Sequence, residues 1–172
     1  MTPELEAAVA AVHAARDREH MAPTIAAFEA LAAEHPDEPE LVYEVAGAYD
    51  TAGEEDRAVP LYERALAMGL QGDALRRCLI QYGSTLRNLG RLHASLAALD
   101  RADAAFPGSA AVAVFRALSL TELGRTDAAV ATLLRLLAAD PPGDLARYAA
   151  AAAGDAAFLL ERDHRDTGTR RA

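Results

Sequence analysis

The 172-residue sequence predicts an all-α fold built from repeated helical hairpins, and three observations carry this prediction. Alanine and leucine together occupy 66 of the 172 positions, and both residues strongly favour helices. The sequence contains no tryptophan and only 5% aromatic residues, which disfavours a β-sandwich or a β-barrel. Chain-breaking residues recur at a spacing near 34 residues, which is typical of stacked helix–turn–helix units.

The breaking residues form two alternating sets. Pro107 and Pro141 lie 34 residues apart, and Gly53, Gly90 and Gly124 are spaced by 37 and 34 residues. Each glycine falls about midway between two breaks of the other set. Alternating breaks of this kind indicate units in which two helices are joined by a short turn.

The segments between the breaks carry helix start signals and helical apolar spacing. Thr2-Pro3-Glu4 supplies a capping hydroxyl, a first-turn proline and an acid. The acids at 54–56 favour a helix N-terminus, and Ser109 is an N-cap candidate. The segment 162–172 lacks apolar periodicity, so we expect a disordered tail there. The predicted helices lie near 3–18, 22–35, 38–51, 55–69, 73–89, 92–105, 109–123, 126–139 and 144–161.

The residues inside these units resemble the tetratricopeptide repeat (TPR) family, whose 34-residue pattern runs W-x₂-L-G-x₂-Y, A-x₃-F and P. In the third unit Leu79, Tyr82, Gly83 and Leu86 fill the first-helix positions, and Pro107 closes the unit. The resemblance implies a right-handed α-solenoid of about four units with a C-terminal capping helix. It implies one domain over 1–161, with repeats at 5–38, 39–72, 76–109 and 110–143 and the capping helix at 144–161.

The resemblance also predicts how the helices pack. Small residues stand where helices cross, at Ala46, Ala65, Gly83, Ala102 and Ala117. Large residues fill the remaining gaps, at Tyr49, Tyr62, Leu86, Leu99, Leu120 and Leu133. Arg116 departs from the pattern because an apolar residue is expected there, and this departure predicts weaker packing in the fourth unit.

Charge and composition narrow the classes of partner. The formal net charge is −9, whereas nucleic-acid binding uses clustered basic residues, so nucleic acid is not the expected partner. The first residues are acidic where a secretory signal needs basic ones, and no uncharged apolar run reaches the ~18 residues of a membrane span. A single cysteine, Cys78, allows no intramolecular disulfide. We therefore expect a cytoplasmic protein without a membrane segment.

The candidate catalytic and metal-binding groups are few. His13, Asp17 and His20 share one helix face and could approach a metal, but no fourth ligand is apparent. Cys78 lies beside Arg76 and Arg77, yet no histidine is placed in sequence to act as its base. No phosphate-binding, dinucleotide-binding or zinc-protease motif is present. The sequence predicts a protein that is not an enzyme and uses no cofactor and no metal.

The resemblance implies a binding surface instead, because the first helix of each TPR unit lines a groove. The corresponding apolar positions form a row that we expect to be exposed, with Leu118 extending it, and Arg87 beside Asn88 suits a carboxylate. The predicted groove residues are Val9, His13, Arg16, Tyr43, Gly47, Asp50, Arg77, Ile80, Ser84, Arg87, Asn88, Val114 and Leu118.

The function implied by this groove is a non-catalytic protein-interaction module that binds a peptide or a helix. The alternative is a structural or assembly protein that acts mainly through self-association. An uneven charge, net −12 over residues 1–74 and net +3 over 75–172, predicts weak head-to-tail association of copies that salt suppresses.

Overall fold

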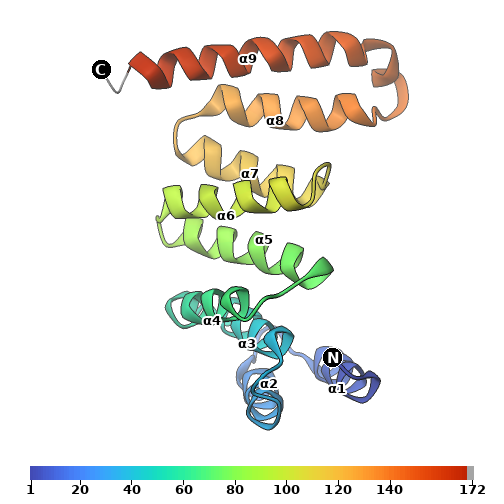
Figure 1. Ribbon diagram of the computed structural model, residues 1–172, viewed down its shortest axis with the longest axis vertical. Coiled ribbons are helices and arrows are strands. Elements are labelled where there is room, and N and C mark those ends of the chain that lie inside the picture. The colour runs from blue at the N-terminus through green and yellow to red at the C-terminus, as the bar shows by residue number, and fades with distance from the viewer. Residues whose placement is uncertain (170–172) are drawn as a thin grey trace. The chain divides into compact units, whose positions relative to one another are not determined.

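The computed structural model describes residues 1–169, and within them every regular element is a helix (Figure 1). The first eight helices lie within three residues of their predicted limits, so the all-α prediction is confirmed. Their bounds are α1 Pro3–Ala15, α2 Ala22–Glu34, α3 Pro39–Thr51, α4 Glu55–Ala67, α5 Gly72–Asn88, α6 Leu92–Ala105, α7 Ala110–Glu122 and α8 Thr126–Ala139. A 3₁₀-helix, η1 Gly143–Tyr148, precedes α9 Ala149–Thr169.

The chain divides into two compact units, Met1–Leu89 and Gly90–Ala172. Unit 1 holds α1 to α5, and unit 2 holds α6 to α9. The predicted single domain over 1–161 therefore spans both units, and the predicted repeat 76–109 contains the boundary between them.

Local signals act at the helix ends as the sequence predicts. The Thr2 hydroxyl accepts a hydrogen bond from the Leu5 amide at 3.3 Å and caps α1. Gly53 has φ +76° and Gly124 has φ +73°, in the left-handed region that glycine enters without strain. After α3, the amide of Glu54 donates to the Tyr49 carbonyl at 2.9 Å, which closes the helix in a Schellman motif.

Unit 1 is held by a continuous apolar core. Tyr62 and Leu41 are fully buried, and Phe28 from α2 and Cys78 from α5 belong to the same cluster. Ala46 and Ala65, two of the predicted small residues, are also fully buried, as expected where helices approach closely. Fully buried side chains of this size each contribute roughly 1.5–3 kcal/mol relative to exposure, so this core dominates the stability of the unit.

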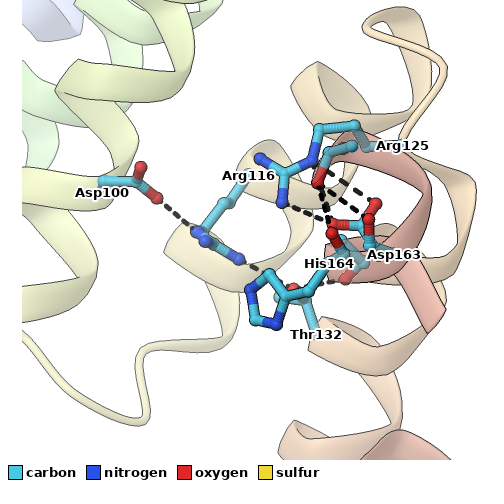
Figure 2. Close-up of polar contacts among 8 residues, drawn as sticks. Asp100, Arg116, Arg125, Thr132, Asp163 and His164 are labelled. Carbon is cyan, nitrogen blue, oxygen red and sulfur yellow. Dashed lines mark hydrogen bonds and ion pairs between the residues drawn. The ribbon is translucent and has the colours of Figure 1, made fainter. Parts of the chain in front are cut away.

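Unit 2 has a smaller core and a polar network instead (Figure 2). Arg116 on α7 donates to Asp100 on α6 at 2.7 Å and to Thr132 on α8 at 2.9 Å. The sequence-based view that Arg116 weakens this packing is thus wrong, because its guanidinium bridges three helices. Leu133 differs from its prediction too: it is 36% exposed on α8 and does not fill a gap.

The end of the chain corrects two predictions. The predicted capping helix 144–161 begins as the 3₁₀-helix and becomes α-helical only at Ala149. The predicted disordered tail is helical through Thr169, while residues 170–172 lie outside the described part. The physical reason is an ion pair: Asp163, only 4% exposed, accepts from Arg125 at 2.6 Å and holds α9 beside α8 (Figure 2).

Candidate functional site

The apolar row of the predicted groove does not form an exposed strip. In unit 1, Val9 is 7% exposed, Tyr43 3% and Ile80 8%. Only Val114 and Leu118, on α7 of unit 2, are exposed, at 44% and 45%. The expectation of an open apolar strip over all units is therefore wrong. The side chain of Tyr43 is covered by its neighbours, with the Tyr62 ring at 6.3 Å between centroids and the Arg77 guanidinium 5.5 Å from its own ring centre.

Several of the predicted groove residues nevertheless meet at one cavity of about 420 Å³ in unit 1, which we call the basic pocket. Side chains from α1, α3 and α5 line it, together with the α1–α2 connection and the first turns of α2. The lining residues are His13, Arg16, Arg18, Met21, Thr24, Phe28, Tyr43, Glu44, Gly47, Ala48, Thr51, Arg77 and Gln81.

Three arginines give the basic pocket its charge. Arg77 makes an ion pair with Asp73 at 3.1 Å. The side chains of Arg16 and Arg18 have no ion pair or side-chain hydrogen bond within residues 1–169. The pocket therefore presents two guanidinium groups whose charges no carboxylate of the described chain neutralises by direct contact.

A buried carboxylate forms one wall of the basic pocket. Glu44 accepts from His13 across 3.0 Å, and this contact joins α3 to α1. Burial raises the pKa of Glu44, whereas the nearby His13 and Arg77 act in the opposite direction. Glu44 thus neutralises part of the positive charge, but it is engaged with His13 and leaves Arg16 and Arg18 unpaired.

The floor of the basic pocket is a second polar group. The Tyr62 hydroxyl, fully buried, donates to Asp50 at 3.1 Å, and its oxygen is also 3.1 Å from Gln81 Oε1. Burial raises the pKa of Asp50, and hydrogen bonds from Thr85 and Tyr62 counter that effect. A methyl group added at Gly47 would lie 3.4 Å from Gln81 Oε1, so glycine keeps this floor open.

The remaining predicted groove residues lie outside the basic pocket. The amide of Asn88 donates to Glu55 at 2.9 Å, so it already binds a carboxylate of its own chain. The Arg87 guanidinium reaches the Ser84 hydroxyl at 3.5 Å. The structure therefore brings His13, Arg16, Tyr43, Gly47 and Arg77 together and separates them from Val114 and Leu118, which belong to the other unit.

A larger cavity of about 730 Å³ lies elsewhere in unit 1, among α2, α3 and α4. Its floor is apolar, with Val42 and Val45 buried. Its polar groups largely satisfy one another: Tyr49 donates to Glu29 at 2.5 Å, and Arg57 donates to Tyr49 while stacking over its ring at 3.9 Å. The basic pocket is the better recognition site because its arginines are not paired in this way.

Sequence reasoning missed several residues of the basic pocket. Arg18, Met21, Thr24 and Glu44 line it, yet none of them is a predicted groove position. The prediction considered only the first helix of each unit, whereas Arg18 lies in the α1–α2 connection and Thr24 in α2. The available signal was Arg18 two residues after Arg16, in a half of the chain where acids far outnumber arginines.

The other candidate chemistry takes structural roles. His20 pairs with Asp17 at 3.1 Å while His13 pairs with Glu44, so the predicted histidine face does not converge on one point. Cys78 is fully buried. Within the described part of the chain, no group of three or more histidine, cysteine or acidic side chains is arranged to hold a metal ion. No helix in residues 1–169 combines the length and the apolar character needed to cross a bilayer.

Comparisons with known proteins agree with this architecture. The MamA RS-1 ArsTM double mutant is 15% identical, with a TM-score of 0.68 over 94% of this chain and 97% of that one. MamA 41-end from Desulfovibrio magneticus RS-1 is 16% identical, with a TM-score of 0.66 over 100% and 99%. MamA MSR-1 C2 is 19% identical, with a TM-score of 0.53 over 83% and 68%. At these identities the likeness shows the fold alone.

The sequence itself carries the family assignment. No curated protein sequence matches the chain. A family model described as "Tetratrico peptide repeat" matches residues 39–159, and the match starts at Pro39, the first residue of α3. This match covers well over half of the chain. The chain belongs to the tetratricopeptide repeat family.

Proposed function

We propose that this chain is a non-catalytic protein-interaction module and that unit 1 binds a peptide or a helix of a partner at the basic pocket. Membership of the TPR family supports an interaction or assembly role. The observation that carries the proposal is the pocket itself, where α1, α3 and α5 present unpaired Arg16 and Arg18 around a cavity of about 420 Å³. We propose that it acts in the cytoplasm, as its single cysteine suggests.

The non-catalytic part of the proposal has its own support. The carboxylates best placed for acid–base chemistry, Glu44 and Asp50, are tied to His13 and Tyr62. These contacts join neighbouring helices, which is a structural use of the groups. An interaction surface needs only shape, charge and exposed polar groups, and the basic pocket supplies all three.

Site-specific photo-crosslinking in the native host tests this function. A photoreactive amino acid replaces Thr51, which is exposed and lines the basic pocket, or Arg64, which is exposed and lines the larger cavity. We expect one or a few distinct proteins cross-linked through position 51 and none through position 64. Equal cross-linking at both positions, or none at position 51, would contradict the assignment.

A second function, self-association, is favoured by a different observation. Among the described residues, seven of the eight large apolar side chains that are exposed lie in unit 2: Val114, Leu118, Val130, Leu133, Leu137, Tyr148 and Phe158. Exposed apolar surface of this kind often marks an interface. If copies associate through it, the double change Leu118→Ser and Leu133→Ser lowers the mass measured by concentration-dependent light scattering. An unchanged monomer mass at all concentrations would remove this alternative.

A further inference from the structure

Helix α2 begins without the groups that usually satisfy a helix N-terminus. Its N-cap residue, Met21, makes no side-chain capping bond, and its first turn contains no acid. By contrast, α1 is capped by Thr2 and carries Glu4 and Glu6 in its first turn. The uncapped amides and the helix dipole give the start of α2 a partial positive charge that an anion would stabilise.

The start of α2 faces the same cavity as the unpaired arginines. Met21 and Thr24 line the basic pocket, and so do Arg16 and Arg18. Thr24 is buried, at 5% exposure, and its hydroxyl makes no hydrogen bond within the described residues. Two independent features, a helix start and a pair of guanidinium groups, thus provide donors for one negatively charged group.

The surroundings limit how much negative charge a ligand can carry. Unit 1 has 16 acids and 7 arginines, a net charge of −9, whereas unit 2 has 10 of each. Long-range repulsion by this acidic unit disfavours a strongly acidic segment or a nucleic acid. Short-range contacts in the basic pocket still favour a single anion, because charge-assisted hydrogen bonds act over a few ångströms.

We propose that the basic pocket binds the side-chain carboxylate of one aspartate or glutamate, presented by an internal segment of a partner protein that is otherwise neutral or basic. Arg16, Arg18 and the first turn of α2 hold the carboxylate. The basic residues of the segment lie toward the acids of unit 1. This inference rests on the proposed interaction function and names the chemistry that the partner must carry.

The test uses small blocked probes, so that no terminal charge contributes. N-acetyl-glutamate N-methylamide and its glutamine analogue are titrated into the ¹⁵N-labelled full chain, and amide shifts are followed. We expect saturable shifts of the Ala22 and Thr24 amides with the glutamate probe. We expect about tenfold weaker binding of the glutamine probe, since it lacks the charge-assisted bonds.

Variants locate the site. Arg16→Gln and Arg18→Gln should each weaken binding of the glutamate probe several-fold, and the double variant by about tenfold or more. Arg64→Gln removes the same charge from an exposed position of unit 1 outside the pocket, so it should leave binding unchanged. Equal binding of the two probes, or equal binding by the double variant and wild type, would overturn the inference.

Two further outcomes are distinguishable. Inorganic phosphate binding more than tenfold tighter than the glutamate probe would overturn the carboxylate assignment in favour of a phosphate group. Cross-linking through position 51 that persists in the double variant would leave the interaction function standing while the carboxylate inference fails. Loss of cross-linking in the double variant, but not in Arg64→Gln, would support both.

Discussion

The two units share one repeat pattern but are stabilised differently. Unit 1 buries its large apolar side chains in a continuous cluster and carries a net charge of −9. Unit 2 is neutral, has a smaller cluster around Leu96 and Leu120, and exposes seven large apolar side chains. Ion pairs such as Arg116–Asp100 and Arg125–Asp163 connect its helices. The same repeat thus tolerates an apolar or a partly ionic way of joining helices.

One register position shows the contrast directly. Tyr43 in α3 and Val114 in α7 are predicted at the same groove position, yet Tyr43 is 3% exposed and Val114 44% exposed. In unit 1 the neighbouring Tyr62 and Arg77 cover Tyr43. Position within the repeat therefore does not fix exposure, because the size and direction of neighbouring side chains decide it.

The largest expected effect comes from placing a charge at this shared position. Tyr43→Asp buries an unpaired carboxylate beside Glu44 and should lower the free energy of unfolding by about 3–5 kcal/mol. Val114→Asp, the matched change in unit 2, should cost no more than about 0.5 kcal/mol because the site is exposed. Urea unfolding followed by circular dichroism measures both. Similar losses for the two variants would mean that the units do not differ at this position.

A smaller effect is expected from the ion pair that holds α9. Asp163→Asn weakens two charge-assisted bonds from Arg125 and should cost about 1–3 kcal/mol. Hydrogen exchange should then quicken along 149–169 and stay unchanged in α1 to α4. Asp127→Asn, which removes the exposed partner of Arg162, is the matched control and should have a smaller effect. Unchanged protection of α9 in Asp163→Asn would show that apolar contacts alone hold this helix.

The smallest effect concerns pH and Glu44. Burial raises the pKa of this carboxyl above the 4.5 of a free side chain, so the folded state binds the proton more tightly than the unfolded state. The stabilising contribution of protonated Glu44 is therefore present at low pH and is lost as the pH rises through the folded-state pKa.

The variant Glu44→Gln isolates this contribution. It is compared with its parent in a His13→Gln background, which removes the titrating partner; Arg77 and Glu40 also act on this carboxyl and are left in place. The melting temperature of the parent minus that of the variant should fall between pH 4 and pH 7. A difference that is constant, or that rises with pH, would contradict the raised pKa.

The sequence predicted the helices well because their signals are local. The left-handed glycines Gly53 and Gly124, the Thr2 cap and the alternation of breaks all act within a few residues of where they stand. The helical end of the chain was missed because it depends on Asp163 meeting Arg125, 38 residues earlier in the sequence. No periodic pattern in a tail predicts a contact of that separation.

The candidate site was predicted only in part, for a related reason. His13, Arg16, Tyr43, Gly47 and Arg77 were found because a repeat pattern places the first helix of each unit on one surface. The burial of Tyr43 and the contribution of α2 depend on how three helices and a connection close around a cavity. Such closure follows from side-chain packing, which register alone does not determine.

The most direct test of the account maps a bound peptide onto the chain. A blocked peptide selected from a random display library on the full chain is titrated into ¹⁵N-labelled protein. The account predicts the largest amide shifts around the basic pocket in unit 1, at residues 16–24, 47–51 and 77–81, with little change at Val114 and Leu118. Shifts concentrated on α7 and α8 of unit 2, with the basic pocket unaffected, would contradict it.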